Sequence, residues 1–441
     1  MINLPKEYEW VDLSDPNFNK ALELILHSDQ NLNIIGCAGS GKSTLLKLAY
    51  SLLGDQTVVL SSTGISAANL SARGIKGSTI HSFFKLPPLN IFPDSIGKNN
   101  RVLEDILVNI DTILIDEVSM VPAALMDKML QLLYEYRTNH DMDLPRVILF
   151  SDILQLPCIV DKDNPDVYSY YEKMYEGNTF FFNSVFYQQH DFMTINLNHI
   201  YRQKDTSFQN ILNRIRQGTQ TNEDLQIINQ QVISEEEYFI HNELYIYLAS
   251  TNAVADSIND SYLSTYPGMP RQYKGYTTGR FDLSKIPQLS NLVTLKKEMQ
   301  IMCLKNNSEN GYQNGTLGTI EDMYYDSIKI NTKNGRTNVV RENWDQYEYG
   351  YNEIAKEVIA EKVGTFNQIA AKPASAITIH KSQGLEFDNV YINLGFVTQG
   401  LTYVALSRCR TLEGIGLDHP IRHTDIRVAR EALDFLEKQG V

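Results

Sequence analysis

The chain has 441 residues, enough for roughly two to four domains of ~150 residues each. Hydrophobic residues make up 43% of it and charged residues 21%, an ordinary globular composition, and no apolar run approaches the ~20 residues that a membrane helix needs. The net charge of −14 argues against a protein that coats nucleic acid by bulk electrostatics, although it leaves room for a local strand-binding groove.

The four cysteines are scattered without the spacing of a metal site: Cys37, Cys158, Cys303 and Cys409. This pattern fits a reducing compartment rather than a disulfide framework. Residues 1–20 are polar and acidic and lack the features of a signal or transit peptide. We therefore expect a cytoplasmic protein of bacterial or phage type, with no membrane association.

A glycine-rich loop follows the first predicted strand. Residues 36–44 read GCAGSGKST, between an apolar stretch at 32–35 and a run at 43–53 with helical spacing of its apolar positions. This is the pattern of a phosphate-binding loop, in which backbone N–H groups and a helix N-terminus face the phosphates. Lys42 is expected to reach the β- and γ-phosphates, and the Ser43 hydroxyl to bind Mg2+. The predicted nucleotide-binding residues are Gly36, Cys37, Ala38, Gly39, Ser40, Gly41, Lys42, Ser43 and Thr44.

Further strands are predicted at 57–62, 112–116 and 146–152, separated by helical patterns. This alternation predicts a parallel sheet with helices on both faces. Such sheets bind ligands at the carboxyl ends of their strands, where the glycine loop falls. The first half of the chain is therefore expected to be an α/β nucleotide-binding domain.

Acidic and amide side chains follow two of these strands. Asp116 and Glu117 end one strand, where an Asp can hold Mg2+ and a Glu can orient the attacking water as a base. Gln155 follows the next strand, where a neutral amide can hydrogen-bond the γ-phosphate and that water. Arginine suits the charge of a transferred phosphoryl group because its planar fork binds phosphate oxygens in pairs. Arg202 and Arg408, in the second half of the chain, are the candidates for this role.

The second half begins a similar alternation near residue 192, which breaks at about 265 and returns at about 366. Within the break, Asn314-Gly315 and Asn334-Gly335 are strong hairpin signals between β-rich runs. We predict a small β-barrel inserted into a second α/β domain. Residues 87–100 read as a surface insertion in the first.

Eight motifs in order resemble those of the superfamily 1 helicases: GCAGSGKS, STGISAANL, GSTIHSFF, ILIDEVSM, FSDILQLP, YRQKD, TIHKSQG and YVALSR. More narrowly they resemble the petite-integration-frequency (Pif) family, relatives of the RecD and phage Dda helicases. The resemblance covers nearly the whole chain and implies two RecA-like ATPase domains, each with an insertion. The implied division is 1–185 for the first domain with a candidate wedge at about 85–108, 186–264 with 366–441 for the second, and an SH3-like barrel at 265–365.

The resemblance also implies roles residue by residue. The hydrolytic set is Lys42, Asp116, Glu117, Gln155, Arg202 and Arg408, with Mg2+ on Ser43 and Asp116. Gly384 and Glu386 join the ATP site. The residues that match strand-contacting motifs are Thr63, Gly64, His81, Phe83, Thr378, His380, Lys381 and Ser382. The glutamine that reads adenine in the family is not at its usual place, and Asn19 is the nearest amide.

Physical chemistry supports a strand-binding surface. The hydroxyls of Thr63, Ser78, Thr79 and Ser82 can hydrogen-bond phosphates without reading sequence. His81 and Phe83 can stack on bases, although one ring of the Phe83-Phe84 pair is expected in the core. Sparse neutral contacts also suit a motor of net charge −14, because it must release each phosphate in order to step.

The activity that the resemblance implies is ATP- and Mg2+-dependent movement from 5′ to 3′ along single-stranded DNA, with separation of duplexes that carry a 5′ tail. Several members of the family also resolve G-quadruplexes, and we expect a monomer in solution. Two alternatives remain open. One is an RNA helicase of the same superfamily. The other is a nucleotide-gated nucleic-acid-binding subunit without unwinding activity, which the departures from the family pattern at Ser151 and Cys158 favour slightly.

Overall fold

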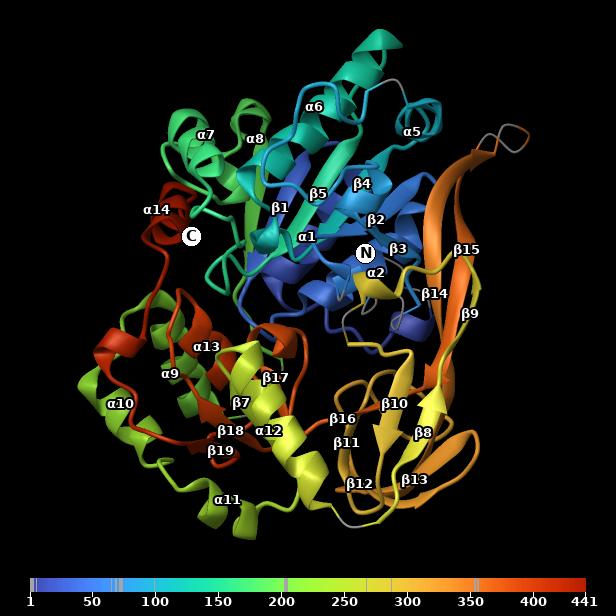
Figure 1. Cartoon of the computed structure of the whole chain (residues 1–441). Coiled ribbons are helices and arrows are strands. Elements are labelled where there is room, and N and C mark those ends of the chain that lie inside the picture. The colour runs from blue at the N-terminus through green and yellow to red at the C-terminus, as the bar shows by residue number, and fades with distance from the viewer. Residues whose placement is uncertain are drawn as a thin grey trace.

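The computed structural model describes residues 4–441 except 5, 65, 68, 69, 71–73, 99, 202–204, 267, 287, 353, 355 and 356. Two parallel sheets lie one above the other, and an antiparallel region stands beside them (Figure 1). In the part of the chain that is described, no helix is both long and apolar enough to cross a membrane. The predicted α/β fold with parallel sheets is confirmed.

The first sheet has six parallel strands in the order β3-β2-β4-β5-β1-β6. They are β1 (Asn31–Gly36), β2 (Thr57–Ser61), β3 (Gly77–Thr79), β4 (Thr112–Asp116), β5 (Arg146–Ser151) and β6 (Phe192–Leu197). The helices of this part are α1 (Pro16–His27), α2 (Lys42–Leu53), α4 (Ile80–Phe83), α5 (Arg101–Leu107), α6 (Ala123–Asn139), α7 (Pro165–Tyr175) and α8 (Val185–Gln189).

Successive side chains of its central strands enter different cores because they point to opposite faces. Leu114 of β4 packs with residues of α1 and α2, whereas Ile113 and Ile115 pack with residues of α5 and α6. Both faces of the sheet are thus buried under helices, which leaves the carboxyl ends of the strands for ligands.

Strand β6 corrects the predicted start of the second domain. Phe192–Leu197 pairs in parallel with β1 and so completes the first sheet, instead of opening the second one after residue 185. The pattern of strands and helices continues across this point, so it could not reveal which sheet the strand joins. The approach is close, since a Cβ added at Gly36 would lie 2.9 Å from the Leu197 carbonyl oxygen.

The second sheet has four parallel strands in the order β17-β7-β18-β19. They are β7 (Ile246–Ala249), β17 (Ala376–Thr378), β18 (Val390–Asn393) and β19 (Ile415–Leu417). The helices after residue 205 are α9 (Thr206–Gln217), α10 (Asn222–Asn229), α11 (Glu235–His241), α12 (Asn252–Thr265), α13 (Leu401–Leu406) and α14 (Arg430–Lys438).

Helix α14 departs from the predicted division. Its Ala432 and Leu436 belong to the core of the first sheet, and Phe435 stacks on Phe182 with ring centroids 4.2 Å apart. Figure 1 shows this helix beside α7 and α8. The end of the chain therefore returns to the first domain.

The antiparallel region forms a seven-stranded sheet, β16-β11-β12-β13-β14-β15-β9, and the pair β10-β8. The strands are β8 (Arg271–Lys274), β9 (Tyr276–Gly279), β10 (Leu292–Leu295), β11 (Gln300–Cys303), β12 (Leu317–Met323), β13 (Ser327–Thr332), β14 (Gly335–Asn352), β15 (Glu357–Ile369) and β16 (Ala371–Pro373). Asn334-Gly335 does turn a hairpin, between β13 and β14. Because β16 pairs with β11, the region extends past the predicted limit of 365.

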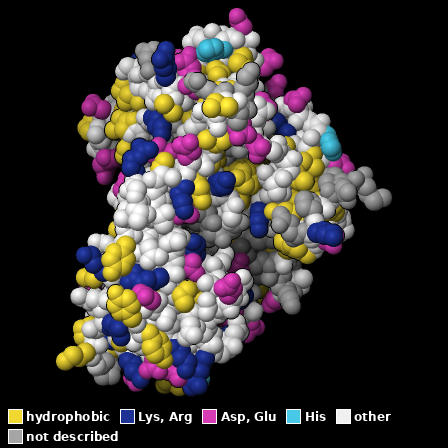
Figure 2. Space-filling model, turned by 90° about the vertical axis from the view of Figure 1, so that its right-hand side faces the viewer, with side chains coloured by type: hydrophobic (Ala, Val, Ile, Leu, Met, Phe, Trp, Pro, Cys, Tyr) yellow, Lys and Arg dark blue, Asp and Glu magenta, His cyan; other side chains and the backbone are white. Residues whose placement is uncertain are grey.

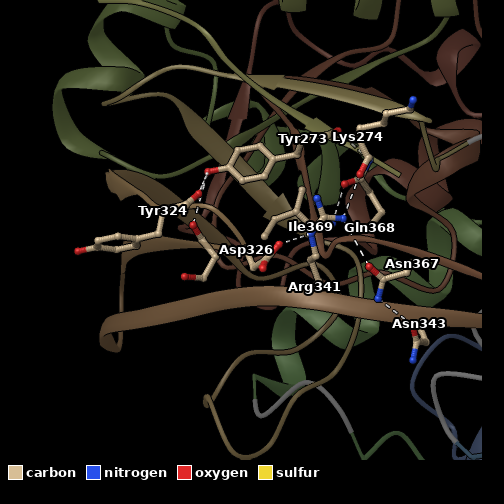
Figure 3. A network of polar contacts seen from close by, with 10 residues as sticks. Tyr273, Lys274, Tyr324, Asp326, Arg341, Asn343, Asn367, Gln368 and Ile369 are labelled. Atoms are coloured by element: carbon tan, nitrogen blue, oxygen red, sulfur yellow. Dashed lines mark hydrogen bonds and ion pairs between the residues drawn. The ribbon is translucent and has the colours of Figure 1, made fainter. Parts of the chain in front are cut away.

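Polar contacts join the two sheets of this region (Figure 3). Arg341 donates from Nε to Asp326 at 2.8 Å and from Nη1 to the Lys274 carbonyl oxygen at 3.0 Å. Gln368, buried on β15, donates to the Tyr273 carbonyl oxygen at 3.0 Å. Side chains of the large sheet therefore satisfy backbone groups of β8, which would otherwise be an open edge.

The hairpin of β14 and β15 reaches from this region to the first domain, where it contacts α4, α5 and β3 (Figure 1). Tyr349 of β14 is buried there. Its hydroxyl donates to the Lys76 carbonyl oxygen at 2.6 Å and accepts from the Val59 N–H at 3.0 Å. One hydroxyl thus bridges a donor and an acceptor of neighbouring strands. From that side, Figure 2 shows the surface hollowed between the upper and lower parts of the molecule.

We predict that Tyr349→Phe lowers the free energy of unfolding by ~1–3 kcal/mol, because the buried Val59 N–H and the partly buried Lys76 carbonyl lose their shared partner. Thermal and urea unfolding of the variant and of the parent chain measure this change. Tyr325→Phe, at a side chain that is 76% exposed, is the control and should unfold like the parent. Equal stability of all three proteins would contradict the bridging role of Tyr349.

Candidate nucleotide site

A cavity of about 980 Å³ lies at the carboxyl ends of the first sheet and is also lined from the second domain. The first domain supplies predicted residues Ala38, Gly39, Ser40, Gly41, Lys42, Ser43, Thr44, Thr63, Asp116, Glu117 and Gln155. The second supplies Thr378, His380, Lys381, Gly384, Glu386 and Arg408. The structure therefore gathers most of the predicted site into one cleft between the two halves.

The glycine loop runs from β1 into α2 as predicted. Gly41 caps the helix with φ of 90°, a left-handed conformation that favours glycine. Lys42 Nζ donates to the carbonyl oxygens of Gly36 and Cys37, both at 2.9 Å. Gly36 and Cys37 do not line the cavity themselves. They contact the site through these two hydrogen bonds from Lys42.

The acidic pair at the end of β4 is strained and electrostatically crowded. Glu117 has φ of 53°, which is uncommon outside glycine and costs of order 1–3 kcal/mol. Its N–H donates to Asp116 Oδ1 at 3.0 Å. Burial, and after it the negative charge of Asp116, raises the pKa of the Glu117 carboxyl to about 7, against the opposing charges of Lys42 and Arg408. Such a pKa suits a general base at neutral pH.

The donor set fits a magnesium ion that is shared with a nucleotide. Ser43 and Asp116 offer one hydroxyl and one carboxylate, both on the wall of the cavity. Within the described ranges, no group of three or more His, Cys, Asp and Glu side chains could hold a metal by itself. Mg2+ in phosphate-transfer sites takes one or two protein ligands together with phosphate oxygens and water, and the residues present match that requirement.

Arg408 is 2% exposed and lies just after α13. Its guanidinium donates to the carbonyl oxygens of Val404, Ser382 and Leu385 at 2.9, 3.3 and 3.2 Å. These bonds hold the group at the cavity wall, within electrostatic reach of Glu117. The second predicted arginine, Arg202, lies outside the described residues.

Two aromatic rings flank the glycine loop. A Cβ added at Gly41 would lie 3.3 Å from the Phe18 ring and 3.5 Å from the Tyr201 ring, and both residues line the cavity. Asn19 does not line the cavity, and its assignment to the nucleotide site stays a prediction. Helix α1 begins at Pro16 and turns Phe18, rather than its neighbour, toward the loop.

The predicted strand contacts divide into four groups. Thr63, Thr378, His380 and Lys381 line the large cavity. Gly64 lines a separate groove of about 200 Å³ with Ser78, Thr79 and Ser82 of the first domain and with residues of the antiparallel region. His81 lines neither and is partly exposed, with its ring centroid 6.3 Å from that of Phe92.

The other two predicted strand contacts are buried. Phe83 is 3% exposed and packs edge-on against Tyr349 of the hairpin, with ring centroids 5.4 Å apart. The Ser382 hydroxyl is fully buried and donates to the Ile379 carbonyl oxygen at 2.7 Å. The prediction that these two side chains contact a strand is wrong in this structure, because each is already covered by protein.

Several lining residues escaped the sequence prediction. Ser250, Thr251 and Asn252 follow β7 and line the cavity from the second domain. Because ligands bind at the carboxyl ends of parallel strands, the position of these three residues after β7 could have identified them. Trp10, Val11 and Asp12 also line it, but nothing in the motifs points to the segment before α1.

Comparison with known proteins identifies the family. A profile of the PIF1-like helicase family matches residues 17–226. The crystal structure of Bacteroides sp Pif1 in complex with ADP-AlF4 is 30% identical, with a TM-score of 0.85 over 98% of this chain and 97% of that chain. The chain belongs to the Pif1-like helicase family. The predicted resemblance is thereby confirmed.

Two further Pif1 proteins extend the comparison. Bacteroides Pif1 bound to ssDNA matches at 30% identity over 97% of each chain, with a TM-score of 0.66. The ATP-dependent DNA helicase Pif1 of Campylobacter jejuni is 27% identical over 408 residues, which is 88% of each chain.

We predict that Glu117→Gln lowers kcat for ATP hydrolysis by about 100- to 10,000-fold, the usual contribution of a general base. The amide keeps the shape of the side chain, so nucleotide affinity should change by less than about tenfold. Phosphate release and binding of a fluorescent nucleotide measure the two quantities. A variant that retains more than half of the parent kcat would show that Glu117 is not the base.

The lining around Gly41 also predicts weak selectivity for the base. Stacking rings accept any purine, whereas strong rejection needs a hydrogen-bonded polar group in the site. We expect kcat/KM for GTP within about tenfold of that for ATP, measured by phosphate release under identical conditions. A preference for ATP of about a thousandfold or more would mean that a polar reader of adenine exists elsewhere.

Proposed function

We propose that this Pif1-like protein is an ATP-dependent DNA helicase that moves from 5′ to 3′ on single-stranded DNA and separates duplexes. The observation that carries the proposal is the single cavity in which the glycine loop, Asp116, Glu117 and Gln155 face Arg408 of the other domain. A nucleotide held there touches both halves of the molecule. The names of the similar proteins support DNA as the substrate.

The chemistry follows from the positions of these groups. Lys42 and the loop N–H groups bind the phosphates, and Glu117 takes the proton of the attacking water. Ser43 and Asp116 would hold a magnesium ion, which would supply positive charge to the phosphate oxygens. Arg408 stabilises the charge that develops on the transferred group. Arg408 comes from the second domain. Hydrolysis of the bound nucleotide therefore changes a contact that links the two domains.

The groove of about 200 Å³ supports a path for a nucleic-acid strand. The hydroxyls of Ser78, Thr79 and Ser82 line one side, and Lys305 with Trp344 line the other. Lys305 lies over the Trp344 ring, with Nζ 5.7 Å from the centroid. Lys, Arg, Asp and Glu are intermingled on this face (Figure 2), which fits weak transient phosphate contacts better than a basic track.

Finer features remain part of the proposal. The candidate wedge at residues 85–108 is supported by its position, since its helix α5 packs against the β14 strand of the long hairpin. The family resemblance extends the substrates to G-quadruplex DNA, and we expect the active species to be a monomer. The RNA helicase and the binding subunit without unwinding activity are retained as outcomes of the test below.

The proposal predicts ATP-dependent unwinding of a duplex with a 5′ single-stranded tail and none of a duplex with a 3′ tail. A fluorescent strand-separation assay measures both, with Lys42→Ala as the inactive control. Matched RNA tails and duplexes test the nucleic acid. Unwinding from the 3′ tail alone would reverse the proposed polarity, unwinding of RNA alone would favour the RNA helicase, and no unwinding would favour the binding subunit.

A further inference from the structure

A buried carboxylate lies between the two domains, outside the hydrolytic set described above. Asp152 follows β5 of the first sheet and is 1% exposed. Arg216, in the last turn of α9, donates to its Oδ1 from Nε at 2.9 Å and lies 2.8 Å from it at Nη2. The arginine is itself buried, at 7% exposure. The ion pair therefore joins the first sheet to a helix of the second domain.

The other oxygen of Asp152 binds two groups of the nucleotide site. Gln155 Nε2 donates to Oδ2 at 3.2 Å, and the Tyr403 hydroxyl donates to the same atom at 3.1 Å. The Tyr403 oxygen also accepts from the N–H of Ala38, in the glycine loop, at 3.1 Å. Tyr403 belongs to α13 of the second domain. One tyrosine from that domain thus fixes the phosphate loop and, through Asp152, the Gln155 carboxamide.

Charge makes this contact costly to break. Burial alone would raise the pKa of Asp152, but the charges of Arg216 and Lys42 and the hydrogen bonds from Arg216 and Tyr403 lower it. The carboxylate is therefore ionised in this arrangement, and removing Arg216 alone would leave a buried charge without its cation. The contact is also tight, since a Cβ added at Gly400, before α13, would lie 2.5 Å from the Gln155 carbonyl oxygen.

We propose that Tyr403 and Arg216 are positioning residues that transmit the state of the γ-phosphate site to the second domain. They hold the Gln155 carboxamide through Asp152, and Tyr403 also holds the loop directly at the Ala38 N–H, so a shift of either group moves α9 and α13. This inference rests on the proposed function, because it names the contact through which hydrolysis would move one domain relative to the other. The two residues are assigned to this coupling between the nucleotide site and the second domain, and not to the hydrolysis step itself.

Tyr403→Phe is the sharpest test because it removes one oxygen atom. Tyr238→Phe is a matched control in the same domain: its hydroxyl is also buried and donates to the Gly414 carbonyl oxygen at 2.6 Å, away from the cavity. We expect similar falls in melting temperature for the two variants. Only Tyr403→Phe should lower DNA-stimulated kcat, by about tenfold, the effect of ~1.4 kcal/mol, with KM for ATP changed less than threefold.

A combined variant tests whether the effect passes through Gln155. In a Gln155→Ala background, adding Tyr403→Phe should lower kcat by a clearly smaller factor than in the parent, because one of the two groups that it positions is already gone and only the contact with the Ala38 N–H is left to lose. Arg216→Lys, which keeps the charge but loses the two-nitrogen contact, should lower DNA-stimulated kcat in the same way with KM for ATP again nearly unchanged.

The outcomes separate this inference from the proposed function. A parent protein that fails to unwind DNA would remove the proposed function, and the inference with it. A parent that unwinds, together with a Tyr403→Phe variant that matches Tyr238→Phe in kcat and KM, would overturn the inference alone. Full additivity of Tyr403→Phe with Gln155→Ala would also overturn it. A selective fall in kcat that becomes clearly smaller in the Gln155→Ala background would support it.

Discussion

The ion pair between Asp152 and Arg216 is the constraint on which the arrangement of this molecule depends. An ionised carboxylate that is 1% exposed needs its cation close by, and here the cation comes from the other domain. The pair therefore joins a helix of the second domain to the carboxyl end of β5 in the first sheet. The cavity with the candidate catalytic groups lies where the two domains meet, with Arg408 on one wall and the glycine loop on the other.

Two other links hold the halves together, and each is of a different kind. The hairpin of β14 and β15 is fixed to the first sheet by the Tyr349 hydroxyl and by apolar packing against Phe83. Helix α14 buries Ala432 and Leu436 in the first core after the chain has left the second sheet. These links lie away from the cavity, so they can guide relative movement of the domains without taking part in hydrolysis.

Short sequence patterns correctly predicted the features whose geometry depends on neighbouring residues. The glycine loop, strand β4 with its acidic pair and the Asn334-Gly335 hairpin all depend on residues that are neighbours in sequence, and each was found at the predicted place. Arg216 and Tyr403 lie 64 and 251 residues from Asp152. No spacing rule connects residues so far apart, so this joint between domains could be seen only in three dimensions.

The wrong predictions have the same origin. Phe83 appeared suitable for stacking on a base. The hairpin that covers it comes from a strand more than 250 residues later in the chain, so the sequence around Phe83 gives no sign that its ring is buried. Strand β6 was assigned to the wrong sheet because pairing partners are not encoded in the alternation of elements. On α1, the side chain that lies against the glycine loop is Phe18, which the motifs did not single out.

The most direct test of this account is the distance between the two domains as nucleotide binds. All four cysteines are buried, so dyes can be placed on new cysteines at the exposed positions Lys173 of α7 and Glu236 of α11. The account predicts that a transition-state analogue of ATP changes energy transfer between the dyes in the parent chain and not in a Lys42→Ala background. Unchanged transfer in a parent chain that binds the analogue would contradict it.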